Sequence, residues 1–150
     1  MSSGMCQFIH QLKQVEFLAW SFKMKNRYYN PKTKRLLTFK QLLNSAFKTF
    51  DKVGIVAKQD FTCCLTCGNS EIDNHFRPDS VGYTFYSAQD YEDLRMNDNV
   101  YLAFSSWDGN EEKSKEVGFI IKKHLESHEL NVDWNGEVRI RIMVFKTHHL

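Results

Sequence analysis

The periodicity of the apolar residues changes once along this 150-residue chain, and this change constrains the fold more than any other feature. Before residue 51, apolar side chains recur every three or four positions, which is the spacing of one face of an α-helix. After residue 51, short runs rich in β-branched and aromatic residues prevail, and these favour strands. Helices and strands do not alternate throughout, so the pattern indicates an α+β domain and not a doubly wound sheet.

The clearest helix is predicted to begin at Phe39, after a Thr38–Gln41 capping box, and to end near Phe50. Two more helices are predicted over residues 6–25 and 111–129, and the polar stretch 89–99 has room for a helical turn. Strands are predicted over residues 53–57, 82–87, 100–105, 130–134 and 138–144, the last two forming a hairpin around Asn135-Gly136. We therefore expect a mostly antiparallel sheet of about five strands with helices packed on one side.

Charge divides the chain into two parts. Residues 1–50 carry nine Lys/Arg and one Glu, whereas residues 51–150 carry eleven Lys/Arg and seventeen Asp/Glu. We expect a basic N-terminal helix and loop over residues 1–36 and an α+β domain over residues 37–150, together one compact unit. The basic segment suits a protein partner, a twin subunit or nucleic acid, with a solvated loop as the alternative. The candidate phosphate contacts are Lys23, Lys25, Arg27, Lys32, Lys34 and Arg35.

The apolar runs are short. None approaches the roughly 18 residues that span a bilayer, and polar residues interrupt the N-terminal apolar positions, so no signal-peptide core is expected. Four cysteines without such a signal favour a reducing compartment over a disulfide framework. We therefore expect a soluble cytoplasmic protein that does not bind membranes.

Three of the four cysteines lie within five residues, in Phe61-Thr62-Cys63-Cys64-Leu65-Thr66-Cys67-Gly68. Zinc prefers thiolate and imidazole ligands in a tetrahedron, and the two-residue gap between Cys64 and Cys67 lets both sulfurs reach one ion. Zinc is therefore a candidate cofactor, with Cys63, Cys64, Cys67 and His75 as its candidate ligands, although the sequence does not establish that a cofactor is bound. Two features oppose this: no second such pair follows, and adjacent side chains diverge in a strand or a helix.

Two alternatives remain for these thiols. A dithiol oxidoreductase could use the Cys64-x-x-Cys67 pair if a helix start lowered the pKa of one thiol. The flanking residues oppose this, because the motif lacks the preceding Trp and the internal Gly-Pro of thioredoxins. The other alternative is that the three cysteines are small buried apolar side chains. The sequence does not decide whether the protein is an enzyme.

Longer blocks of the sequence resemble a known family. These blocks are Asp60-Phe61-Thr62-Cys63-Cys64-Leu65-Thr66-Cys67-Gly68, Gly82-Tyr83-Thr84-Phe85-Tyr86, Tyr101-Leu102-Ala103-Phe104 and Val132-Asp133-Trp134-Asn135-Gly136. Their order over about residues 37–143 is similar to that of an uncharacterised bacterial family of domains of unknown function with a D-F-x-C-C-x-x-C-G block. Members of that family often have histidine where this chain has Ser87. The resemblance implies a compact domain and no particular chemistry.

Other polar residues are weaker candidates. His124 and His128 lie one helical turn apart, a spacing that can bind a metal, but both fall on the apolar face of their helix, which favours partly buried, hydrogen-bonded histidines. No phosphate-binding glycine loop is present. The sequence therefore favours an intracellular binding or interaction domain, with a structural zinc or a thiol cluster as its one distinct site.

Overall fold

The computed structural model describes residues 29–30 and 35–146. The chain divides into two compact units, residues 1–38 and 39–150. In the first unit, strands β1 (Tyr29–Asn30) and β2 (Arg35–Leu36) form an antiparallel pair. The helix predicted over residues 6–25 and five of the six predicted phosphate contacts, all except Arg35, lie outside the described residues.

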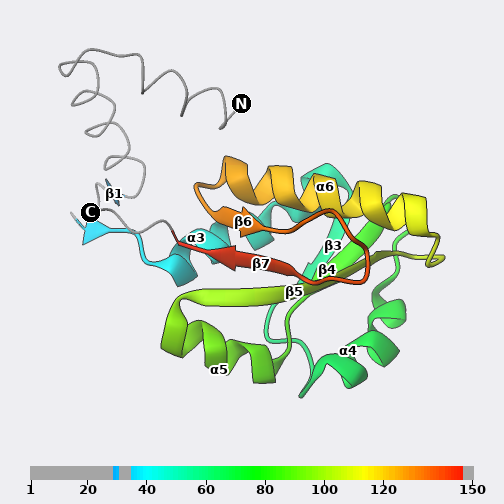
Figure 1. Cartoon of the computed structure of the whole chain (residues 1–150), viewed down its shortest axis with the longest axis horizontal. Helices are drawn as coiled ribbons and strands as arrows, with labels where there is room; N and C mark the ends of the chain where they lie inside the picture. Colours follow the sequence, from blue (N-terminus) through cyan, green and yellow to red (C-terminus); the bar gives the residue numbers. More distant parts are fainter. Residues whose placement is uncertain (1–28, 31–34, 147–150) are drawn as a thin grey trace, which may run out of the picture. The chain divides into compact units, whose positions relative to one another are not determined.

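The second unit has the predicted α+β composition (Figure 1). Its helices are α3 (Phe39–Lys48), α4 (Leu65–Glu71), α5 (Ala88–Asn97) and α6 (Glu111–Ser127), with short 3-10 helices η1 (Phe50–Val53) and η2 (Ile72–His75). Its strands are β3 (Ile55–Lys58), β4 (Gly82–Phe85), β5 (Asn99–Ser106), β6 (Asn131–Asp133) and β7 (Ile142–Phe145). The three elements predicted over residues 39–50, 82–87 and 111–129 form close to their predicted bounds.

The five strands form one sheet in the order β3-β4-β5-β7-β6. All neighbours are antiparallel except β3 and β4, which run parallel with Ile55 opposite Gly82. The mostly antiparallel five-stranded sheet is therefore confirmed. Because two parallel strands need a long crossover connection, α4 and η2 between β3 and β4 fill that role, and the thiol segment lies at the start of this crossover.

The helices α3 and α6 cover one face of the sheet. The apolar face of α3, which the sequence periodicity predicts, buries Phe39, Leu42, Leu43, Ala46 and Phe47. α6 approaches β4 closely: a Cβ on Gly82 would lie 2.7 Å from a methyl group of Val117 and 2.5 Å from the Ser105 carbonyl oxygen. His124 of α6 and His128 at the C-cap of α6 are partly buried. Each has its Nε2 3.1 Å from Thr49 Oγ1, so the prediction of partly buried, hydrogen-bonded histidines is confirmed.

Helix α4 packs on the opposite face. Side chains alternate along a strand, so Phe85 of β4 points away from the face that Gly82 presents to α6. Its ring lies against Gly68 of α4 and contacts Phe61 at 5.5 Å between ring centroids. The fold class is as predicted, but helices lie on both faces and not on one side alone (Figure 1), because the β3–β4 crossover places α4 on the far face.

Two segments differ from the sequence prediction in their extent. The stretch 89–99 forms the full helix α5, whose start is a capping box between Ser87 and Asp90, each bonding to the backbone N–H of the other. Strand β7 begins only at Ile142, so Asn135-Gly136 is not a two-residue hairpin turn. The chain from residue 134 to 141 folds around the buried Trp134 indole, whose Nε1–H is donated to the carbonyl oxygens of Glu137 and Ile140.

Candidate metal centre

The three cysteines lie where β3 ends and α4 begins. The loop between these elements is fixed to the junction of β4 and α5: the Phe61 N–H donates to the Tyr86 carbonyl oxygen at 2.8 Å, and the Ala88 N–H donates to the Thr62 carbonyl oxygen at 2.9 Å. The Thr62 hydroxyl also donates to the Cys64 carbonyl oxygen at 3.0 Å. These bonds hold the backbone on the N-terminal side of the thiols against the sheet.

This loop contains two residues in the left-handed region, Asp60 at φ 50° and Thr62 at φ 59°. Asp tolerates this conformation, but a β-branched residue such as Thr rarely adopts it, and such a residue costs on the order of 1–3 kcal/mol. Directly after this loop, Cys63 faces the first turn of α4, where Cys64 is the N-cap residue and Cys67 follows three positions later.

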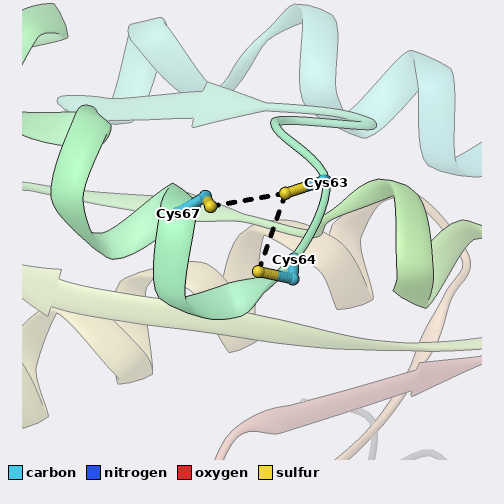
Figure 2. A group of neighbouring side chains, drawn as sticks. All are labelled: Cys63, Cys64 and Cys67. Carbon is cyan, nitrogen blue, oxygen red and sulfur yellow. Dashed lines mark hydrogen bonds between the residues drawn. The ribbon is translucent and has the colours of Figure 1, made fainter.

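The three sulfurs converge on one point (Figure 2). Cys63 Sγ lies 3.3 Å from Cys67 Sγ and 3.8 Å from Cys64 Sγ, and all three sulfurs lie within 4.8 Å of one another. Cys63 is exposed, the other two are half-buried, and all three are free thiols. The adjacent cysteines converge because Cys63 belongs to the irregular loop and Cys64 to the extended N-cap, so the alternation of a strand or a helix does not apply.

The thiols perturb one another's protonation. Hydrogen bonds from the Cys67 backbone N–H, and then from the thiols of Cys67 and Cys63, lower the pKa of Cys64 because they stabilise its thiolate. Hydrogen bonding to the sulfurs of Cys63 and Cys64, together with their negative charge, raises the pKa of Cys67 to about 12. Without a cation, hydrogen bonds between the three thiols therefore stabilise the negative charge of the cluster. A bound cation would stabilise that charge instead and release the thiol protons.

His75, the fourth predicted ligand, does not belong to this group of three thiols. It is exposed at the end of η2, and its ring meets the ring of Phe61 edge-on, with 5.3 Å between centroids. His75 also lines a polar depression of about 290 Å³ together with Lys58 and Arg77. The structure thus brings together three of the four predicted ligands.

A polar cluster that the sequence gives no sign of lies at the same edge of the sheet. Lys40 Nζ donates to the Tyr86 hydroxyl at 2.7 Å and to Gln59 Oε1 at 3.0 Å, and the Tyr86 hydroxyl donates to the same Gln59 oxygen at 3.0 Å. Burial lowers the pKa of Lys40 and raises that of Tyr86. The sequence does not single out Lys40, since its partners lie 19 and 46 positions away.

None of the helices over the described residues combines the length and apolar composition that crossing a bilayer requires. No curated protein and no solved structure matches this chain. One family model does match it, described as Domain of unknown function (DUF6891), over residues 37–149. This match includes the whole sheet, the crossover and the thiol cluster, and the chain therefore belongs to the DUF6891 family.

Proposed function

We propose that this domain binds one soft metal ion, with zinc as the first candidate, through the thiolates of Cys63, Cys64 and Cys67. The convergence of the three sulfurs carries the proposal. Zinc–sulfur bonds of about 2.3 Å at tetrahedral angles separate the sulfurs by about 3.8 Å. The Cys63–Cys64 separation is 3.8 Å and the Cys63–Cys67 separation is 3.3 Å, so small side-chain rotations suffice to complete the arrangement.

The donor set also indicates which ions fit. Thiolates select zinc and copper(I) over magnesium or calcium, which prefer oxygen ligands. Three protein ligands leave one position of a tetrahedral zinc ion for an exchangeable ligand, whereas structural zinc sites are closed by four. His75 remains our proposed fourth ligand if its side chain moves from Phe61 when the metal binds.

The strained loop supports a functional role for the cluster. Thr62 adopts a conformation that its side chain disfavours, yet hydrogen bonds at Phe61, Thr62 and Ala88 hold it there. Backbone strain of this kind persists where the surrounding structure enforces it, and such positions concentrate at functional sites. Three cysteines that served only to fill a core would also be buried, whereas Cys63 is exposed.

We further propose that the domain serves as a cytoplasmic binding or interaction module. A reducing compartment would keep the three thiols available for metal. The excess of Lys and Arg in residues 1–50 supports association with an acidic protein partner, with nucleic acid as the alternative. Such an association is expected to weaken as salt rises from low to physiological concentration, and binding that salt does not affect would contradict it.

The metal proposal is tested on a Cys6→Ser background, so that only the three clustered thiols remain. We expect one zinc per chain by elemental analysis of protein purified without chelators, and a sulfur-to-cobalt charge-transfer band when cobalt(II) replaces zinc. Cys67→Ser should lose both signals. His75→Ala should weaken zinc binding if His75 is the fourth ligand and leave it unchanged otherwise. Purified protein with no zinc, no cobalt band and three freely alkylated thiols would disprove the proposal.

The thiol oxidoreductase remains the second candidate, and one observation favours it: two sulfurs of the cluster lie in direct contact. The contact pair is Cys63 and Cys67, not the Cys64-x-x-Cys67 pair that the sequence suggests. Turnover of a disulfide substrate that depends on Cys63 and Cys67, with no metal bound under reducing conditions, would favour this candidate over the metal site.

A further inference from the structure

The shortest contact of the cluster joins Cys63 and Cys67, with 3.3 Å between the sulfurs. A disulfide bond is about 2.0 Å long, so these sulfurs need to approach by little more than about 1 Å. The contact between Cys63 and Cys64 is longer, at 3.8 Å, and a bond between adjacent cysteines would distort the peptide that joins them. The geometry therefore identifies Cys63 and Cys67 as the pair that would oxidise.

Access and rigidity favour the same pair. Cys63 is the exposed member of the cluster, so a small molecule can reach its sulfur from solvent. Cys67 lies in the first turn of α4, and that helix is held by the contact between Gly68 and the Phe85 ring. Since both backbones are fixed, the two sulfurs stay close to each other. This closeness favours a bond between Cys63 and Cys67 over a reaction of either thiol with a second molecule from solution.

We propose that Cys63 is a site of thiol–disulfide exchange with low-molecular-weight disulfides, and that the resulting Cys63–Cys67 disulfide prevents metal binding. In the first step the Cys63 thiolate attacks one sulfur of a disulfide such as oxidised glutathione, forming a mixed disulfide and releasing one glutathione thiolate. In the second step the Cys67 thiolate attacks the Cys63 sulfur and releases the other. Two electrons pass from the two cysteines to one glutathione disulfide, and the two cysteine protons end on two glutathione molecules.

The consequence for the metal site follows from the ligand count. Oxidation of Cys63 and Cys67 leaves Cys64 as the single free thiolate of the cluster, and one thiolate does not hold zinc or copper(I) against water. This part of the inference rests on the proposed metal site, whereas disulfide formation does not. Oxidised protein is expected to bind zinc at least about a hundredfold more weakly than reduced protein, since two ligands are lost.

The exchange is tested on the metal-free full chain with Cys6→Ser, equilibrated in buffers of increasing oxidised-to-reduced glutathione ratio, quenched with acid and analysed by intact mass after alkylation. We expect a two-electron oxidation without retained glutathione, and the same product in Cys64→Ser. In Cys67→Ser, the mixed disulfide with Cys63 should accumulate, because a bond from Cys63 to the adjacent Cys64 would distort the peptide that joins them. A disulfide that forms equally well in Cys63→Ser would assign the pair to Cys64 and Cys67 and overturn the proposal, as would no oxidation at all.

A separate measurement distinguishes this inference from the proposed function. Zinc affinity is determined by competition with a chromophoric chelator, once under reducing conditions and once after oxidation. Zinc bound by the reduced protein and lost on oxidation supports both proposals. Failure of the reduced protein to bind zinc, with disulfide formation intact, removes the metal site and the regulation that rests on it but keeps the thiol–disulfide exchange. Zinc binding that persists after oxidation removes only the regulation.

Discussion

The ring of Phe85 occupies the space that a side chain on Gly68 would need: a Cβ built on Gly68 would lie 2.4 Å from the Phe85 ring. This contact seats α4 on the sheet, and Phe85 is fully buried beneath it. Gly68 directly follows Cys67, so the packing of the helix and the position of one thiol depend on the same contact. The close approach of the Gly68 backbone to the Phe85 ring thus holds the short helix α4 and, with it, the Cys67 thiol in place.

Gly68→Ala should therefore destabilise the domain and weaken metal binding together. Alanine favours helix by about 1 kcal/mol relative to glycine, but the clash with a buried ring costs more, and overpacking typically costs about 1–3 kcal/mol. We expect a net loss in the free energy of unfolding, measured by urea denaturation, and weaker zinc affinity. Ser70→Ala, an exposed position on the same helix, serves as the control and should change neither; a Gly68→Ala variant with unchanged stability would show that α4 does not depend on this contact.

The sequence predicts the elements of this domain better than their connections. The apolar face of α3 and the segment 82–85 are local patterns, and local patterns were sufficient to find them. The parallel pairing of β3 with β4 is not local, since it depends on how the chain from residue 59 to 81 crosses the sheet. The conformation of residues 134–141 is also not set by a local pattern. There the buried Trp134 indole donates its N–H to two backbone carbonyl oxygens, and the chain does not continue as a strand.

The thiol cluster was predictable in composition but not in geometry. The spacing of Cys63, Cys64 and Cys67 indicated a metal site, while regular backbone geometry indicated that two of the side chains would diverge. The irregular loop at Cys63 and the extended N-cap at Cys64 resolve this conflict. No rule based on residue type would assign the left-handed conformation in this loop to a threonine such as Thr62. For His75 the sequence indicated a ligand that the structure does not bring to the site. A histidine eight positions after Cys67 is a suitable zinc ligand by type and spacing, but its ring lies against Phe61 and outside the group of three thiols.

Tyr86→Phe tests the polar cluster beside the site. The Tyr86 side chain is fully buried, and its hydroxyl bonds to both Lys40 and Gln59. Removing the hydroxyl leaves those two groups with one partner fewer, so we expect a loss of about 1–2 kcal/mol in the free energy of unfolding. Tyr101→Phe removes a hydroxyl from an exposed position of β5 and should stay within about 0.5 kcal/mol of the parent protein. Equal effects of the two substitutions would argue against a structural role for the cluster.

The contact between α3 and α6 should make stability depend on pH. His128 faces Ser45, Thr49 and His124, and burial, followed by the charge of His124, lowers the pKa of its imidazole. Since the unfolded chain then binds a proton more readily than the folded one, stability is complete above about pH 6.5 and decreases as pH falls toward the lower pKa of the folded state.

Urea denaturation between about pH 7.5 and pH 5.5 measures this dependence, because the window spans the ordinary histidine pKa. His128→Gln keeps a polar side chain but cannot titrate, so its free energy of unfolding should fall less over that range than that of the parent. His75→Ala removes an exposed histidine and should keep the full dependence. A His128→Gln variant with the pH dependence of the parent would assign the effect to other groups.

Metal binding should also increase the stability of the folded domain. A ligand that binds only the folded state at about a hundred times its Kd adds about 2.7 kcal/mol to the free energy of unfolding, and the strained loop at Thr62 gives zinc a segment to stabilise. We expect zinc to raise the melting temperature of reduced Cys6→Ser protein, and magnesium, which prefers oxygen ligands, to leave it unchanged. The shift should be absent in Cys63→Ser, because the lost sulfur is the one in contact with both others. A zinc-induced shift of the same size in that variant would place the ion elsewhere on the protein.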